Sequence, residues 1–223
     1  MIDAESYLAA VIKALQDKFG DRLQYVGLQG SYLRGEATQD SDIDLMVVLD
    51  RVDMPSLDAY REAVCSVGSV EKACGFLCGK EELRNWNALE ACHVLHTTKD
   101  YYGSLEPLLP PFCRADVYQF VKLSLNNLYH ELCHRYIYGG REKSAAKLAI
   151  SSKSVFFILQ NSFYLETGAF VRTKWELLQK LQGPDREVLA LSLRLQKEQS
   201  IDFDADFSLL LSWCQRKLVS ITC

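Results

Sequence analysis

Several features that would place this chain in a common class are missing from its sequence. No apolar run approaches the length needed to span a membrane, and the first residues, MIDAESYLAA, lack the basic and apolar regions of a signal peptide. Positive charge is not in excess either: the net charge is -4, whereas a general nucleic-acid binder is usually basic. We therefore expect a cytoplasmic protein with neither a membrane nor a nucleic acid among its partners.

Metal-binding and disulfide patterns are also scarce. The eight cysteines include no CxxC pair, which argues against a zinc ribbon, and in a cytosolic chain we expect them to be free, mostly buried thiols. The sequence shows no internal repeat and no low-complexity segment. A length of 223 residues, 48% of them hydrophobic, allows one large domain or two small ones with a substantial core.

Apolar periodicity divides the chain into two parts. The first part is predicted to contain helices over 4–19 and 56–67, a short helix starting at Gly30, and strands over 22–28, 43–49, 71–78 and 91–98. Ser56 is the predicted cap of the second helix. The segment LLPPF at 108–112 continues neither a helix nor a strand.

After this break, the pattern is helical throughout, with helices predicted over 114–138, 141–166, 173–182, 184–198 and 204–220. We therefore predict an α+β fold class with two domains. A small mixed β-sheet domain with flanking helices would occupy residues 1–108, and an all-α helical bundle would occupy residues 109–223.

Two carboxylates mark the start of the most apolar predicted strand. Asp42 and Asp44 are two residues apart, so on a strand they project from the same face. Two such charges repel each other and lose solvation unless a cation lies between them. Oxygen ligands of this kind suit Mg²⁺, which commonly takes one or two protein carboxylates together with substrate phosphates.

A glycine–serine turn precedes the carboxylates. Gly30 permits a close approach of the backbone to a ligand, and Ser31 with the following amides would face a phosphate at the start of a helix. Arg34 would add positive charge. Taken singly, a turn, a surface arginine and a DxD pair are each ordinary surface features, and only their combination indicates nucleotide chemistry.

The combination G-S-x-x-R-G-x-x-x-x-x-S-D-x-D-L, residues 30–45, resembles the signature of the polymerase-β-type nucleotidyltransferase superfamily, above all its minimal and aminoglycoside nucleotidyltransferases. The resemblance implies that Gly30 and Ser31, with Arg34 and Ser41, bind a nucleoside triphosphate, with ATP the expected one. It also implies Mg²⁺ on the carboxylate pair. The helical second part resembles the family's C-terminal bundle more loosely, around Lys153 and Lys174, and these two lysines are candidates for contacting the triphosphate.

The family usually adds a third carboxylate from a later strand, as metal ligand or general base. Glu71, Glu81 and Glu82 are the candidates, and Glu71 is preferred because it opens the predicted strand at 71–78. The other two lie in KEEL, which is typical of a helix start. The predicted catalytic residues are therefore Asp42, Asp44 and Glu71.

The run HELCH presents a competing motif. His130 and His134 match H-E-x-x-H, in which two histidines on one helix face bind zinc and the glutamate acts as a base. A catalytic zinc needs a third protein ligand. The remaining histidines, His93 and His96, are three apart on a predicted strand and would point to opposite faces.

The predicted function is transfer of a nucleoside monophosphate from a nucleoside triphosphate to a hydroxyl, with release of pyrophosphate. The acceptor would be a small hydroxylated molecule such as an aminoglycoside, or a protein side chain. A catalytically weak nucleotide-binding regulator or antitoxin-like module is the first alternative, and an HExxH zinc hydrolase is the second. The oligomeric state stays open.

Overall fold

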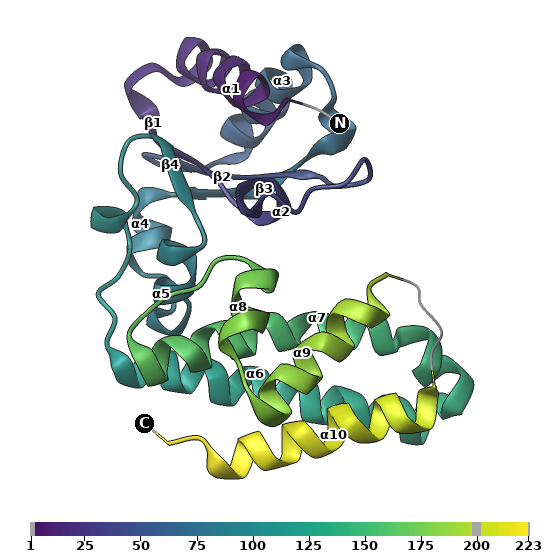
Figure 1. The fold of residues 1–223 in the computed structure, drawn as a ribbon. Helices are drawn as coiled ribbons and strands as arrows, with labels where there is room; N and C mark the ends of the chain where they lie inside the picture. Colours follow the sequence, from purple (N-terminus) through teal and green to yellow (C-terminus); the bar gives the residue numbers. More distant parts are fainter. Residues whose placement is uncertain (1–2, 198–201, 223) are drawn as a thin grey trace. The chain divides into compact units, whose positions relative to one another are not determined.

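The chain forms two compact units, Met1–Phe112 and Cys113–Cys223, each described here by itself (Figure 1). The structure is a computed structural model and describes residues 3–197 and 202–222. The first unit contains a mixed sheet with helices and the second is helical throughout, so the predicted fold class is confirmed. The predicted division at 108/109 lies four residues before the division between the units.

A four-stranded sheet forms the centre of the first unit. Its strands are β1 (Leu23–Leu28), β2 (Ile43–Leu49), β3 (Ala73–Gly79) and β4 (Lys99–Tyr102), in the spatial order β3-β2-β1-β4. The central strand β1 is antiparallel to both β2 and β4, whereas β2 and β3 are parallel. The sheet is therefore mixed.

Helices cover both faces of this sheet (Figure 1). On one face, α1 (Ala4–Phe19) and α3 (Met54–Val67) share an apolar core with Ile43, Leu45, Val47 and Leu49 of β2. On the other face, Met46 and Val48 pack with α4 (Lys80–Arg84) and α5 (Ala88–His96). Because side chains alternate along a strand, Asp44 belongs to the second face, with Met46 and Val48.

The sequence placed a strand over 91–98, and this prediction is wrong. Residues 88–96 form helix α5, which begins where the Asn87 side chain accepts a hydrogen bond from the backbone N–H of Leu89, at 3.1 Å. Good helix formers occupy its first turn, A-L-E-A, and the fourth strand comes later, at β4. His93 and His96 consequently lie three apart on one helix rather than on opposite faces of a strand.

Two smaller predictions in the first unit are also wrong. Helix α3 begins two residues early, and its cap is Asp53, whose side chain accepts a hydrogen bond from the backbone N–H of Ser56 at 2.8 Å. Ser56 itself lies buried inside the first turn. Pro55 in the first turn of α3 already has the backbone angle that a helix start needs.

Strand β3 begins at Ala73, and Glu71 belongs to the preceding 3-10 turn, Val70–Lys72.

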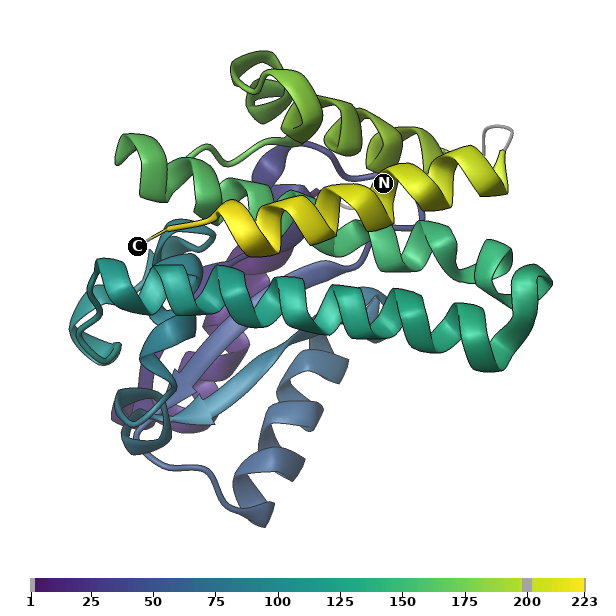
Figure 2. The same cartoon turned by 90° about the horizontal axis from the view of Figure 1, so that it is seen from below.

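The second unit is a bundle of helices. Its elements are α6 (Arg114–His134), a π-helical turn (Arg135–Gly139), α7 (Gly140–Thr167), α8 (Lys174–Lys180), α9 (Gly183–Leu195) and α10 (Phe203–Ser220). Helix α7 packs on α6 and α9, and α10 packs on α6 and α9 (Figure 2). Trp213, Phe156 and Leu125 are fully buried in its core. The five predicted helices are all present, although residue 198, the predicted end of the fourth, lies outside the described residues.

Cysteine burial differs from the prediction. Among the described cysteines, all are free thiols, but only Cys78, Cys92 and Cys214 are buried, while Cys65 and Cys74 are among the exposed ones. Within residues 3–197 and 202–222, no helix is long and apolar enough to cross a membrane.

Candidate active site

The glycine–serine turn lies directly against the start of β2. Gln29 follows β1, and its backbone N–H donates to the carbonyl of Asp44 at 2.8 Å. Gly30 then adopts a left-handed backbone, with φ +70°, and opens the five-residue helix α2 (Gly30–Arg34). The first N–H groups of a helix have no partner within it, so the amides at Ser31 and beyond begin a surface suited to phosphate oxygens.

Gly30 also touches the carboxylate of Asp44. A Cβ added to Gly30 would overlap the Oδ2 atom of Asp44, so no other residue fits here without moving that side chain. The left-handed φ excludes other residues independently of the space. The turn and the carboxylate, 14 positions apart in the sequence, are therefore one local structure.

The two carboxylates differ in environment. Asp42 is exposed just before β2, whereas Asp44 is half-buried as the second residue of that strand. Burial raises the pKa of Asp44, the Arg34 charge lowers it, and the charge on Asp42 raises it further. A charged Asp44 is thus partly desolvated and repelled by its neighbour, which is the situation that a bound divalent cation relieves. The donor set fits Mg²⁺, which accepts two carboxylate oxygens and completes its shell with water or phosphate.

The positive charge of Arg34 acts both on the Asp44 carboxylate and on His93 of helix α5. The Nε atom of Arg34 lies 2.9 Å from an Oε atom of Glu36, and the two side chains are only 16% and 13% exposed. The Arg34 charge lowers the pKa of Asp44 and, after burial, also helps to lower the pKa of His93 to about 4. His93 is therefore neutral near pH 7. The sequence did not predict that His93 lies near Arg34, because residues 91–98 were predicted to form a strand.

Cys74 is a further residue of the candidate site that was not predicted from the sequence. In the parallel pairing of β2 with β3, Cys74 lies directly opposite Asp44. Its thiol makes a hydrogen bond with the Asp44 carboxylate, which lowers the pKa of that carboxylate. Since a single sequence does not state which residues pair in a parallel sheet, no signal in the chain marks Cys74 as Asp44's neighbour.

The structure does not bring Glu71 beside the carboxylate pair. Glu71 is exposed on its 3-10 turn, and its charge acts on Tyr7 of α1, whose pKa is raised by burial first and Glu71 second. Tyr7 belongs to the core on the opposite face of the sheet from Asp44. Within the described residues, no three His, Cys, Asp or Glu side chains form a group able to hold a metal.

The other two candidates lie at the far end of β3. Glu81 and Glu82 follow Gly79, which pairs with Leu49, whereas Asp44 pairs with Cys74. Five residues of strand separate the two levels, or about 16 Å. The candidate site therefore presents two carboxylates and a thiol.

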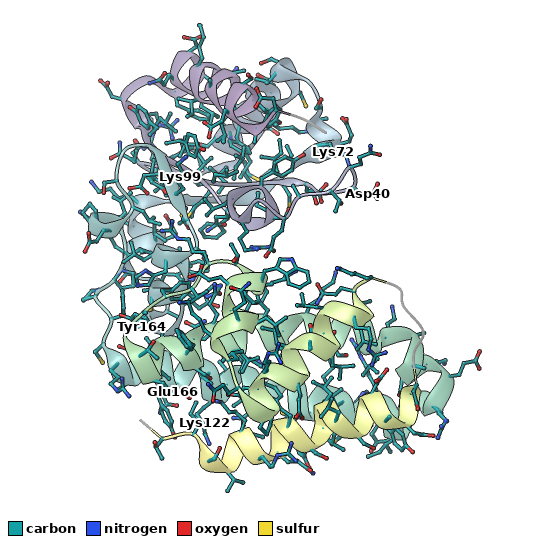
Figure 3. The ribbon with its side chains drawn as sticks, viewed as in Figure 1. Asp40, Lys72, Lys99, Lys122, Tyr164 and Glu166 are labelled. Atoms are coloured by element: carbon teal, nitrogen blue, oxygen red, sulfur yellow. The ribbon has the colours of Figure 1, made fainter. Side chains whose placement is uncertain are left out.

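Ser41 shapes the loop that leads to Asp42. Its hydroxyl accepts a hydrogen bond from the backbone N–H of Thr38 at 2.9 Å, and its own N–H donates to the Thr38 carbonyl at 3.2 Å. Lys72 donates to the carbonyl of Gln39 at 3.1 Å, which ties this loop to the start of β3; Lys72 is labelled in Figure 3. The observed contacts of Ser41 thus order the loop.

Lys153 and Lys174 belong to the second unit. Lys153 is exposed on α7. Lys174 opens α8, and its ammonium donates to the side chain of Gln196 at 3.2 Å and lies 6.0 Å from the centre of the Phe156 ring. These contacts lie within the bundle, and a role of either lysine at the triphosphate stays a prediction.

The HELCH histidines form a ring column rather than a metal group. His130 and His134 share one face of α6, with ring centroids 5.7 Å apart, and the His134 ring lies 4.9 Å from that of Tyr138. Nowhere in residues 3–197 and 202–222 does a third His, Cys, Asp or Glu complete a metal group with them. The zinc-hydrolase alternative therefore lacks a third ligand in the described part of the chain.

Comparison with known proteins identifies the class. Residues 8–84 match the family model named nucleotidyltransferase domain. The structure of spectinomycin adenyltransferase AAD(9) from Enterococcus faecialis, solved with ATP and spectinomycin, has the same fold, with a TM-score of 0.61 over 97% of this chain and 99% of that one, at 15% identity.

Two curated relatives match more closely over short segments. Protein adenylyltransferase MntA of Thermococcus cleftensis is 47% identical over 60 residues, 27% of this chain and 57% of its own length. MJ1379 of Methanocaldococcus jannaschii is 44% identical over 52 residues, 23% of this chain and 50% of its own length. The chain thus spans about half the length of the relatives it matches.

The first unit contains a nucleotidyltransferase domain. The family match over residues 8–84 agrees with the resemblance seen in the GS…DxD motif, and the chain as a whole, with its helical C-terminal unit, shares the fold of the adenyltransferase.

Proposed function

We propose that this protein transfers AMP from ATP to an acceptor hydroxyl and releases pyrophosphate. The observation that carries the proposal is the contact between Gly30 and Asp44, which joins the turn proposed to bind phosphate to the carboxylate proposed to bind the metal. The family match over residues 8–84 supports nucleotidyl transfer, and the name of the MntA relative supports adenylyl transfer.

Each group of the site has a proposed role. Asp42 and Asp44 would hold Mg²⁺, and Gly30 with Ser31 would hold the triphosphate against α2. When bound, Mg²⁺ would neutralise the charge that develops on the attacking and leaving oxygens. Arg34, fixed by Glu36, would supply a permanent positive charge near the phosphates, and Ser41 would position the loop that carries Asp42.

The group that removes the proton from the acceptor hydroxyl is the open part of the mechanism. A base must lie within hydrogen-bond reach of that proton. Glu71 stays the predicted base, and Glu71→Gln tests it. Loss of turnover with unchanged Mg-ATP binding would support Glu71, whereas unchanged turnover would exclude Glu71 as the base.

A protein hydroxyl is the acceptor that we propose first, because the MntA relative is named a protein adenylyltransferase. A small hydroxylated molecule, including an aminoglycoside, is the acceptor to be tested beside it. The net charge of -4 is compatible with a cationic acceptor of either kind.

The deciding experiment combines binding and transfer. The melting temperature is measured with each nucleoside triphosphate, with and without Mg²⁺, since a ligand that binds only the folded state raises it. ATP labelled at the α-phosphate is then incubated with the protein and either cell protein or aminoglycosides. We expect a Mg²⁺-dependent shift that is largest with ATP, and transfer of the label to protein.

Asp42→Asn/Asp44→Asn is expected to abolish both signals. Asp40→Asn is the matched control, because Asp40 is an exposed carboxylate of the same loop, and it should keep both. A shift without label transfer to any acceptor would favour the nucleotide-binding regulator. No shift with any nucleotide would refute the proposed site.

A further inference from the structure

The second unit contains a small pocket that the proposed reaction does not use. It lies where α6 ends, at the π-helical turn and the first turns of α7, and has a volume of about 370 Å³. His134, Arg135, Tyr138, Lys143 and Lys147 line it. Volumes of this order suit small ligands, and π-helical turns are frequent at functional sites.

One wall of the pocket is cationic. Lys143 and Lys147 are one turn apart on α7, so their ammonium groups lie on the same face, and both residues are exposed. Neither ammonium has an ion-pair partner among the described residues. Two like charges at this spacing repel each other, and a shared anion would remove that cost.

Arg135 also lines the pocket, and its side chain is held by two partners. Its guanidinium lies 2.7 Å from a carboxylate oxygen of Glu131 and donates to the hydroxyl of Ser151, also at 2.7 Å. Glu131 therefore neutralises Arg135 and does not oppose the two lysines. The free positive charge of the pocket is that of Lys143 and Lys147.

The lining also includes an aromatic side chain, that of Tyr138. Tyr138 is 77% exposed, and its ring continues the column formed by His130 and His134 along one face of α6. An exposed ring beside a cationic patch is the combination that binds a nucleoside phosphate, because the base stacks on the ring while the phosphate meets the cations.

We propose that this pocket binds a nucleoside phosphate, with the base against Tyr138 and the phosphate between Lys143 and Lys147. The pocket contains no carboxylate pair, so binding requires no divalent metal. The proposal is independent of the proposed function, and a free nucleotide or the end of an RNA strand would supply the same chemistry.

The test uses the full-length chain carrying Asp42→Asn/Asp44→Asn, in EDTA, so that binding at the candidate active site is removed. Isothermal titration is run with AMP, with tripolyphosphate and with a 5′-phosphorylated oligo(A). We expect AMP or the oligonucleotide to bind more tightly than tripolyphosphate, with affinity that falls as salt rises.

Added to this background, Lys143→Gln/Lys147→Gln is expected to weaken binding at least tenfold. Lys13→Gln/Lys180→Gln removes the same charge from exposed, ion-paired lysines elsewhere and should leave binding unchanged. Tyr138→Ala should abolish the preference for AMP over tripolyphosphate. Binding of AMP identifies a free nucleotide as the source, and binding of the oligonucleotide alone identifies an RNA end.

Three results would overturn the proposal. They are no binding of AMP or oligonucleotide, equal binding by the lysine variant and its control, or equal binding of AMP and tripolyphosphate with no effect of Tyr138→Ala. Melting temperatures of all variants, compared with the background chain, establish that each is folded.

Discussion

At the scale of single residues, Gly30 and Gly35 make a natural pair for comparison. Both have left-handed backbones, with φ +70° and +68°, and they flank the same short helix. An added Cβ at Gly30 would overlap Asp44, whereas at Gly35 it would meet nothing within 4 Å. The two positions therefore separate the cost of the backbone from the cost of displacing the carboxylate.

We predict that Gly35→Ala lowers the free energy of unfolding by about 1–2 kcal/mol, the cost of a left-handed non-glycine residue. Gly30→Ala should cost more and should also weaken Mg-ATP binding at least tenfold, because Asp44 must move. Chemical denaturation and a nucleotide titration measure the two effects. Equal Mg-ATP affinity in both variants would contradict the role given to the Gly30–Asp44 contact.

Cys74 gives a second prediction at this scale. Cys74→Asp would place a carboxylate directly opposite Asp44, and like charges opposite each other on paired strands are destabilising. We expect a lower melting temperature in EDTA and a larger rise on adding Mg²⁺ than in the wild-type chain.

Cys65→Asp is the control for this change, since it adds the same charge at an exposed cysteine on α3. It should not increase the response to Mg²⁺. If both variants respond alike, the carboxylate at position 74 does not reach the metal, and the register-based argument for Cys74 fails.

At the scale of secondary structure, the sequence predicted most elements and failed at α5. Helix α1, β1 and β2 follow strong local periodicity, and each appears within a residue of its predicted bounds. The segment ACHVLHTT offers only a short apolar run, which suits a strand or a buried helix equally. The cap at Asn87 and the packing of α5 in one apolar cluster with Met46 and Val48 favour a helix. This packing cannot be recognised from the local sequence.

The partly buried His93 on α5 makes a pH dependence testable. Its pKa in the folded chain is about 4, below the ordinary 6.5, so the unfolded chain binds the proton more tightly. Its contribution to stability is therefore complete above pH 6.5 and is lost as the pH falls from 6.5 toward 4. The loss would be at most about 3 kcal/mol.

We predict that His93→Gln flattens the fall of the unfolding free energy between pH 6.5 and 4.5. His134→Gln, which changes an exposed histidine of α6, should keep the wild-type profile. Urea denaturation at a series of pH values measures both. A wild-type slope in His93→Gln would show that other groups cause the acid sensitivity.

At the scale of the whole molecule, the division into two units was predictable because the strands stop at LLPPF. The residues that make up the candidate site were harder to predict from the sequence. Asp42 and Asp44 are neighbours in the sequence and could be found there, whereas Cys74 and His93 reach Asp44 and Arg34 only through sheet pairing and helix packing. The proposed roles of Lys153 and Lys174 likewise concern side chains of the other unit.

We predict that residues 1–112 and 113–223, produced separately, each unfold cooperatively, since each has its own buried core. Circular dichroism and thermal denaturation would show this. The first fragment should retain a Mg²⁺-dependent response to ATP, weaker than in the intact chain if Lys153 or Lys174 contacts the triphosphate. Failure of either fragment to fold would refute the independence of the units.

The parallel pairing of β2 with β3 has a consequence for the order in which the chain folds. Leu28 pairs with Leu45 across 17 positions, whereas Asp44 meets Cys74 across 30, through a crossover that includes α3. Contacts of low sequence separation generally form earlier, and synthesis delivers residues 28–45 before residue 74 exists. In a chain growing on the ribosome, residues 30 and 44 are therefore both present, and can make the glycine–carboxylate contact, before Cys74, the hydrogen-bond partner of Asp44, has been synthesised.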